Sequence, residues 1–264
     1  MGIDKRPIGI FDSGVGGLTV FKEIEKALPC ESLVYFGDTA RVPYGNKSKQ
    51  TVIRFTTENI LFLLKKKVKL IVIACNTSSS LALKYVRKIF NIPIIGVIRP
   101  AIEKAIKVSK GRIGVIGTKS TIASRAYEEE LKRKDKSSLI FSRPCPLLVP
   151  FIEEGLIKGP LLEHLVKFYL KDLKGKIDTL ILGCTHYPLI KNIVASYLEG
   201  VCIIDSAKEV AINTKRILEK NDLLADRSNV PRKEFYVTDD AENFFKLARM
   251  FLKKDIKKPK LVNV

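Results

Sequence analysis

The sequence predicts an α/β protein made of two similar domains, each a mainly parallel sheet flanked by helices. Short runs rich in Ile and Val alternate with segments of helical spacing, which is the order typical of parallel strands joined by helices. These runs fall into two sets of four. In both sets the third run reaches a small residue and then a cysteine, followed by a hydroxyl-bearing residue: LIVIACNT in the first set and LILGCT in the second.

The first set of predicted strands covers residues 8–13, 33–38, 70–76 and 92–97. Between the first two runs, apolar residues recur at helical spacing from Leu18 to Leu28, which predicts a helix with one buried face. A second helix is expected from about residue 48 to 66. The break between the sets lies near Arg99-Pro100, where a helix over 101–110 takes the place of a fifth strand.

The second set is predicted at residues 112–118, 138–143, 179–185 and 201–206. A helix over 207–220, a further strand near 234–239 and a final amphipathic helix follow. We expect this tail to return to the first set of strands. The predicted domains are therefore 1–98 plus 208–264, which is discontinuous, and 99–207.

Length and composition indicate a globular protein rather than a membrane or secreted one. The chain has 264 residues, of which 46% are hydrophobic and 28% charged, and no apolar run approaches the roughly 20 residues that span a bilayer. The first residues lack the pattern of a signal peptide, so we expect a cytoplasmic location. The five cysteines are widely spaced and form no CxxC pair, which argues against a disulfide framework or a structural zinc site.

The formal charge of +19 raises the question of an anionic partner. The basic residues form short clusters near element ends, at 65–67, 132–134 and 253–260. No aromatic residues interleave with them as in nucleic-acid-binding modules. Solvated surface charge is the interpretation we favour, with nucleic-acid binding as a side activity to be tested.

Cys75 and Cys184 are predicted to lie at the carboxyl ends of their strands, where parallel α/β sheets bind ligands. Two thiols facing each other across a cleft suit inversion at a carbon, because one thiolate removes a proton while the other thiol returns one to the opposite face. The reacting carbon must lie about 3–3.5 Å from each sulfur, which places the sulfurs roughly 7 Å apart. A single core cysteine is the alternative for either residue taken alone.

Polar residues accompany both cysteines at predicted strand ends. Asp12-Ser13 closes the first strand, and its carboxylate could orient a thiol or hold a substrate ammonium group. Asn76-Thr77 follows Cys75, and Thr185-His186 follows Cys184. His186 is a candidate proton relay. His164 lies in a helical pattern and is interpreted as a structural or surface residue.

Two further stretches carry weaker signals. Gly14 to Gly17 (GVGG) lacks the full glycine spacing of a dinucleotide-binding loop, and we interpret it as a tight strand-to-helix turn. The turn-rich stretch 38–45 ends in Tyr44-Gly45, which could offer backbone contacts to a ligand. Cys30, Cys145 and Cys202 have no companion base and receive no role.

Four motifs, GIFDSGVGGLTV, GDTARVPYG, ACNTSSS and GCTHYPL, resemble those of the glutamate racemases, which belong to the aspartate/glutamate racemase superfamily. They occur in the family's order, and the resemblance covers most of the chain up to about residue 220. It implies two similar α/β domains with the active site in the cleft between them, and interconversion of L- and D-glutamate for peptidoglycan. It also implies that no metal, pyridoxal phosphate or nucleotide is needed, and that the protein is a homodimer.

The resemblance assigns roles to residues at matching positions. Cys75 and Cys184 would be the two catalytic acid/bases, assisted by Asp12, His186 and Glu153. The residues expected to bind the amino acid are Asp12, Ser13, Tyr44, Gly45, Asn76, Thr77, Thr185 and His186. Arg99 departs from the pattern, because family members commonly have an acidic residue before this proline.

Two alternative functions stay open at this point. An aspartate racemase would use the same two-thiol chemistry on a shorter substrate. Some glutamate racemases also inhibit DNA gyrase, so the basic surface leaves a secondary DNA- or gyrase-binding role to be tested.

Overall fold

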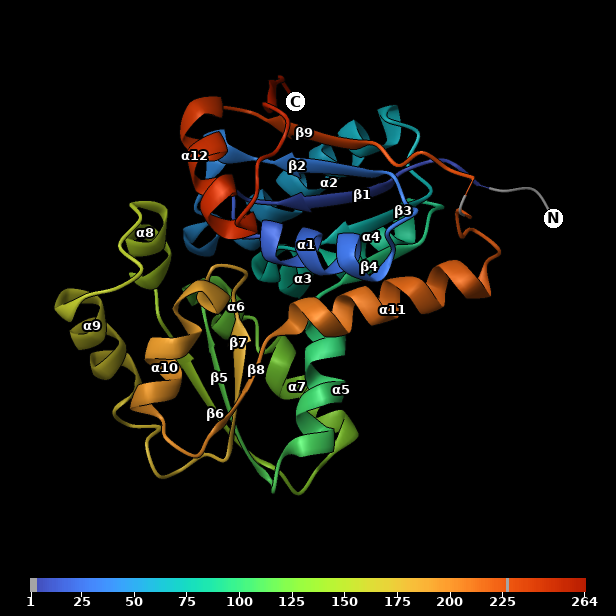
Figure 1. The fold of residues 1–264 in the computed structure, drawn as a ribbon. Coiled ribbons are helices and arrows are strands. Elements are labelled where there is room, and N and C mark those ends of the chain that lie inside the picture. Colours follow the sequence, from blue (N-terminus) through green and yellow to red (C-terminus); the bar gives the residue numbers. More distant parts are fainter. Residues whose placement is uncertain (1–3, 227) are drawn as a thin grey trace.

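The computed structural model describes residues 4–226 and 228–264, and in this part the chain forms two sheets, the larger above the smaller in Figure 1. The larger sheet has the strand order β10-β9-β2-β1-β3-β4 and the smaller β6-β5-β7-β8. All neighbouring strands are parallel. The predicted architecture of two parallel sheets is confirmed.

The strands lie close to the predicted positions. Those of the larger sheet are Ile8–Asp12 (β1), Leu33–Gly37 (β2), Leu70–Ile73 (β3), Ile94–Gly96 (β4), Lys233–Val237 (β9) and Lys260–Leu261 (β10). Those of the smaller sheet are Arg112–Gly117 (β5), Leu139–Pro144 (β6), Thr179–Gly183 (β7) and Cys202–Ile204 (β8). The first four strands of each sheet share one spatial order, second-first-third-fourth, so β3 and β7 are equivalent.

Helices cover both faces of the larger sheet (Figure 1). One face packs against Leu18–Ala27 (α1), Ser206–Lys220 (α11) and Ala241–Leu252 (α12), and the other against Lys49–Lys65 (α2) and Leu83–Ile89 (α4). In β3, Leu70 and Val72 belong to the first core and Ile71 and Ile73 to the second. Burial on both faces explains why this strand is a continuous apolar run.

The smaller sheet is covered in the same way. One face packs against Leu148–Glu153 (α8), Pro160–Leu170 (α9) and Lys191–Tyr197 (α10), and the other against Ile98–Val108 (α5) and Ala126–Lys134 (α7). Two short helices, Asn76–Leu81 (α3) and Lys119–Ala123 (α6), follow β3 and β5. Single 3-10 turns occupy Thr39–Arg41, Tyr44–Asn46 and Tyr187–Ile190.

Some predicted boundaries are wrong by a few residues. Helix α5 begins at Ile98 rather than near residue 101, because Pro100 falls in its first turn, where no N–H is needed. Strands β3 and β7 end before their cysteines. Cys202, expected inside a strand, is the exposed first residue of the edge strand β8, and β10 was not predicted.

The chain passes between the two sheets twice, through β4–α5 and β8–α11, and α11 packs against both α1 and α5. The larger sheet is built from residues 8–96 and 233–261, and the smaller from 112–204. The predicted boundary at 207/208 falls inside α11. The division into domains stays a prediction.

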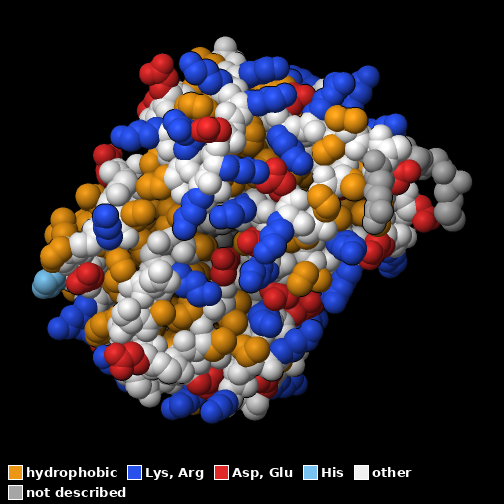
Figure 2. Space-filling model, viewed as in Figure 1, with side chains coloured by type: hydrophobic (Ala, Val, Ile, Leu, Met, Phe, Trp, Pro, Cys, Tyr) orange, Lys and Arg blue, Asp and Glu red, His pale blue; other side chains and the backbone are white. Residues whose placement is uncertain are grey.

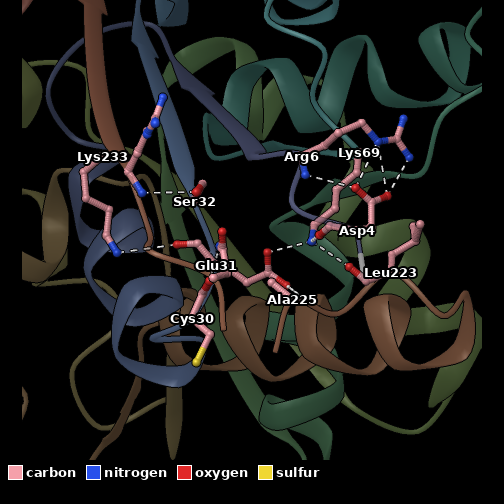
Figure 3. A network of polar contacts seen from close by, with 11 residues as sticks. Asp4, Arg6, Cys30, Glu31, Ser32, Lys69, Leu223, Ala225 and Lys233 are labelled. Carbon is pink, nitrogen blue, oxygen red and sulfur yellow. Dashed lines mark hydrogen bonds and ion pairs between the residues drawn. The ribbon is translucent and has the colours of Figure 1, made fainter. Parts of the chain in front are cut away.

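A buried lysine, Lys69, lies directly before β3 in a network of polar contacts (Figure 3). The Lys69 side chain is fully buried, and its Nζ lies 2.7 Å from Glu31 Oε2 in an ion pair. The same ammonium group donates to the carbonyls of Asp4 (2.7 Å) and Leu223 (2.6 Å). Glu31 Oε1 also accepts the backbone N–H of Ala225 at 2.8 Å. These five residues form the Lys69 cluster, which joins Asp4 to the segment that follows α11.

The surface charge is spread over the molecule. Figure 2 shows Lys and Arg side chains over both the upper and lower parts of the visible face, with Asp and Glu among them. Among the described residues, no helix combines the length and the apolar character needed to cross a membrane.

Candidate active site

The carboxyl ends of the central strands of the two sheets meet, and hydrogen bonds join them. The Thr185 hydroxyl, after β7, donates to Asp12 Oδ1 at the end of β1 (3.4 Å). The hydroxyls of Thr77, after β3, and Thr118, after β5, lie 3.0 Å apart. These contacts bring the predicted strand-end residues together where the two sheets meet, and we call this junction the cleft.

Cys75 caps helix α3 on the larger-sheet side of the cleft. Its Sγ accepts the backbone N–H of Ser78 at 3.5 Å, and the thiol lies 3.9 Å from the Ser13 hydroxyl. Burial raises the pKa of Cys75 to about 12, the charge of Asp12 acts in the same direction, and the Ser78 hydrogen bonds oppose it. A thiol with this pKa is neutral at pH 7.

Cys184 lies on the opposite side and has a base beside it. Its Sγ lies 3.6 Å from His186 Nδ1, and His186 Nε2 lies 3.0 Å from Glu153 Oε1, at the end of α8. Burial lowers the pKa of His186, but the hydrogen bonds with Cys184 and Glu153 outweigh it and raise that pKa well above 6.5. An imidazolium at this position donates a hydrogen bond from Nδ1 to the Cys184 sulfur.

Asp12 lies between the two halves and is fully buried. Its Oδ2 accepts the backbone N–H groups of Gly17 (2.9 Å) and Gly14 (3.4 Å). Burial raises the pKa of Asp12, whereas the charge of His186 and these two N–H groups lower it. A carboxylate in this position is suited to orient a thiol or an ammonium group.

The two thiols lie in one electrostatic environment. Cys75 is 5% and Cys184 6% exposed, and the charge of Cys184 contributes to the raised pKa of Cys75. The contacts named above bring Asp12, Ser13, Thr185, His186 and Glu153 to these two residues. All five were predicted as site residues.

Asn76 and Thr77 also lie in the cleft. The hydroxyl of Tyr127 donates to Asn76 Oδ1 at 2.7 Å. Among the described residues Asn76 Nδ2 is a buried donor with no hydrogen-bond partner. Thr77 is paired with the hydroxyls of Thr118 and Thr121, at 3.0 and 3.2 Å. A buried, unpaired amide N–H group is costly, and an anionic ligand would satisfy it.

Tyr44 and Gly45 contribute differently from each other. The Tyr44 hydroxyl donates to Asp38 and accepts from Asn59 Nδ2, so its ring is anchored within the larger-sheet half. The Gly45 carbonyl accepts the hydroxyl of Ser120 across the cleft at 2.9 Å. A Cβ atom at Gly45 would lie 2.5 Å from Thr118 Cβ. The Tyr44 hydroxyl is therefore engaged, and what this segment can offer a ligand is its backbone.

The glycines after β1 are more than a turn, which sequence reasoning missed. A Cβ atom at Gly16 would lie 2.5 Å from both His186 Nδ1 and Thr185 Oγ1, and one at Gly14 would lie 3.2 Å from Glu153 Oε1. These glycines let the residues around Cys184 approach the first strand end. The sequence feature that could have predicted this role is the position of the glycines directly after Asp12-Ser13.

Three residues of the smaller-sheet half were also missed: Thr118, Thr121 and Tyr127. Thr118 follows β5, which occupies in its sheet the place that β1 occupies in the other. Thr118 could have been predicted as a site residue because its position is equivalent to that of Asp12-Ser13. No local sequence feature predicts the role of Tyr127, because its contact partner Asn76 lies 51 residues away in the chain.

The remaining cysteines and His164 lie outside this constellation. All five cysteines are free thiols, and the buried Cys145 donates to the carbonyl of Arg143, two residues earlier, at 3.7 Å. His164 is exposed on α9, with Nδ1 2.7 Å from the Pro160 carbonyl. Within residues 4–226 and 228–264, no group of three or more His, Cys, Asp or Glu side chains is placed to hold a metal ion.

Comparison with known proteins agrees with this geometry. The family model of the Asp/Glu/Hydantoin racemases matches residues 8–212. The glutamate racemase of Aquifex aeolicus is 47% identical over 257 residues, which cover 97% of each chain. The crystal structure of the Francisella tularensis glutamate racemase in complex with D-glutamate is 40% identical with a TM-score of 0.93, covering 99% of this chain and 98% of the other. That of the Bacillus anthracis isoform RacE1 is 42% identical with a TM-score of 0.95 and the same coverage. With two like-ordered sheets, a thiol after the third strand of each and a family match over most of its length, the chain belongs to the Asp/Glu/Hydantoin racemase family.

Proposed function

We propose that this protein interconverts L- and D-glutamate by a two-thiol mechanism and so supplies D-glutamate for peptidoglycan. One observation carries the proposal: Cys75 and Cys184 follow equivalent strands of two like-ordered sheets and lie in one cleft. The identity of 47% to a glutamate racemase over nearly the whole chain supports glutamate as the substrate.

In this mechanism one thiolate removes the α-proton and the opposite thiol delivers a proton to the other face. His186 and Glu153 stabilise the thiolate form of Cys184 through the contacts at 3.6 and 3.0 Å. On the other side, Cys75 begins as a thiol because of its raised pKa. The same pair works in reverse for the other enantiomer, with Cys75 as the base. No bound cofactor enters this sequence of steps.

Charged groups of the substrate have complementary partners in the cleft. The Asp12 carboxylate is placed to attract an ammonium group, which would also reduce the electrostatic cost of a thiolate at Cys75. The unpaired Asn76 Nδ2 and the backbone of Tyr44-Gly45 are proposed donors to substrate carboxylates. Ser13, Thr77, Thr185 and His186 complete the proposed binding set.

The test is to incubate the protein with each glutamate enantiomer in heavy water without added cofactor, following optical rotation and deuterium at the α-carbon. We expect racemisation with solvent exchange, and a loss of inversion in both Cys75→Ser and Cys184→Ser. Cys145→Ser is the matched control, because Cys145 is also buried with a pKa raised to about 12 yet contacts no base. Racemisation at the parent's rate in both single variants would contradict the mechanism. A larger kcat/KM for aspartate than for glutamate would overturn the substrate assignment.

We further propose that the enzyme is a cytoplasmic homodimer. Large apolar side chains are exposed in the α8–α9 region, at Leu147, Leu156, Leu161 and Phe168, and hydrophobic side chains gather at the left edge of Figure 2, where this region lies in Figure 1. Exposed apolar patches of this kind mark association surfaces. Sedimentation velocity gives the mass that tests the dimer. Nucleic-acid binding has no comparable support, because the basic residues are dispersed.

A further inference from the structure

The two thiols differ in the hydrogen-bonded groups that connect them to the rest of the protein. Behind Cys184, hydrogen bonds lead through both nitrogens of His186 to Glu153, whose side chain is 23% exposed. Behind Cys75, the contacts lead to the Ser13 hydroxyl and the Ser78 N–H group. Both of those residues are buried, and neither ionises near neutral pH. Asp12, whose charge also acts on Cys75, is fully buried and so gives the thiol no direct contact with solvent.

Glu153 borders a cavity of about 120 Å³ between α12, the 3-10 turn at Thr39–Arg41 and the turn after β1. Its lining comprises Gly14, Val15, Thr39, Val42, Glu153, Asp240, Asn243, Phe244 and Leu247. Asp240 and Asn243 are exposed, so the cavity reaches solvent beside α12. Its volume has room for several water molecules, and Glu153, Thr39 and Asn243 offer them hydrogen-bond partners.

A two-thiol racemase needs a route for protons between turnovers. When one enantiomer is converted, the thiolate becomes a thiol and the opposite thiol becomes a thiolate. To act on the same enantiomer again, the enzyme must release one proton and take up another. The solvent is the source and the sink for these protons.

We infer that the cavity beside Glu153 is the port through which Cys184 exchanges its proton with solvent while the substrate is bound, whereas Cys75 exchanges its proton with water only after the substrate has left. The inference rests on the proposed racemisation. When Cys184 carries a proton, His186 is a neutral imidazole with its hydrogen on Nε2. The thiol passes its proton to His186 Nδ1, which forms the thiolate–imidazolium pair, and Nε2–H then passes its proton to the Glu153 carboxylate, which gives it to a water molecule in the cavity. The reverse sequence brings a solvent proton to the sulfur, so that exchange leaves every group in its starting state. Glu153 acts in this as a positioning and relay residue that does not touch the substrate.

The experiment uses the two single-cysteine variants in heavy water. Each lacks inversion, but the remaining thiol can remove and return the α-proton of the enantiomer that it faces. Deuterium appearing in unconverted glutamate then reports how fast that thiol exchanges with solvent. We expect rapid wash-in for one enantiomer with Cys75→Ser, which retains Cys184, and much slower wash-in for the other with Cys184→Ser.

Closing the cavity sharpens the test. Asn243→Phe, placed at the cavity and away from the thiols, should slow the wash-in supported by Cys184 several-fold. Glu242→Phe puts the same ring on the neighbouring exposed residue, which does not line the cavity, and should change nothing. In the enzyme with both cysteines, the same asymmetry should appear in recovered substrate before much conversion, which requires no variant to fold.

The outcomes separate the two proposals. Equal wash-in for both enantiomers, wash-in with neither variant, or no effect of Asn243→Phe would overturn the port in an enzyme that still racemises glutamate. If the parent protein does not racemise glutamate, the proposed function fails and the port fails with it.

Discussion

Strand β3 has a buried polar cluster at each end, and the two clusters differ in how completely their members are paired. At its start, the Lys69 ammonium group has an ion-pair partner in Glu31 and two backbone carbonyls. After its end, Cys75 is a thiol with a pKa raised to about 12, and Asn76 Nδ2 has no partner among the described residues. The fully paired ammonium group of Lys69 helps to hold the fold together, whereas the unpaired amide of Asn76 is available to a ligand.

The comparison extends to the smaller sheet. Asp178 precedes β7 as Lys69 precedes β3, and it accepts hydrogen bonds from Ser109 Oγ (2.7 Å) and from the N–H groups of Lys110 (3.1 Å) and Arg112 (3.0 Å). Cys184 follows the other end of the same strand. In both sheets, therefore, the third strand has a well-paired charge at its start and a buried cysteine after its end.

The largest expected effect is on stability, from Lys69→Met. This change leaves the Glu31 carboxylate buried without its counterion, which costs about 3–5 kcal/mol of unfolding free energy. Denaturant unfolding measures that loss, and the kcat of the folded protein should match the parent's, because the cluster lies at the far end of the strand.

A matched double variant, Lys69→Met with Glu31→Leu, removes both charges and should recover most of the lost stability. If Lys69→Met unfolds at the parent's denaturant midpoint, the cluster does not anchor this end of the sheet. If it lowers kcat in folded protein, the two ends of the strand are not independent.

The second effect is on activity, from Gly16→Ala. The added Cβ would lie 2.5 Å from His186 Nδ1 and Thr185 Oγ1, so both side chains must move. We expect kcat to fall about 100-fold, as for a misplacement near 1 Å, while the unfolding midpoint changes little.

Gly111→Ala is the control for the loss of a glycine. Gly111 has φ +100°, and a Cβ atom added there would meet no other atom within 4 Å, so alanine strains the backbone and costs about 1 kcal/mol of stability. It should leave kcat unchanged. Similar kcat values in the two alanine variants would show that Gly16 has no special relation to the cleft.

The smallest effect concerns the pH dependence of Asp178→Asn. Burial raises the pKa of Asp178, but hydrogen bonds from Ser109, Thr179 and the N–H groups of Lys110 and Arg112 outweigh it and hold that pKa below 3.8. A lowered carboxyl pKa stabilises the folded state above pH 3.8, and this contribution is lost as the pH falls through the folded-state pKa. Asp178→Asn should therefore cost about 1 kcal/mol at pH 7.

Urea unfolding of both proteins at several pH values measures this dependence. The difference between parent and variant should shrink as the pH falls below 3.8. A difference that stays constant, or grows in acid, would mean that the charge of Asp178 does not stabilise the fold in this way.

How much of this was predictable from sequence depends on the range of each contact. The strands could be predicted because strands buried on both faces must be apolar, and Cys75 and Cys184 because they directly follow such strands. The ion pair of Lys69 and Glu31 could not, since nothing local distinguishes this lysine from its neighbours at 65–67. Glu153 was expected only from the family resemblance, because its contact with His186 spans 33 residues.

The same reasoning explains the glycines. Their sequence indicates a turn, and the turn is present, but the reason that Gly16 needs no side chain lies in the other half of the molecule. A local pattern can show that a residue bends the chain. Only the tertiary structure shows what the bend makes room for.

The adjacent crossings of the chain at β4–α5 and β8–α11 have a consequence for how such a protein can be rearranged. Because α5 and α11 pack together, the segment that forms the smaller sheet leaves and rejoins the rest at neighbouring points. It has the connectivity of a segment inserted into the part of the chain that forms the larger sheet. Segments whose ends lie close together tolerate exchange and circular permutation best. The segment that forms the smaller sheet could therefore be replaced while the strand order of the larger sheet stays the same.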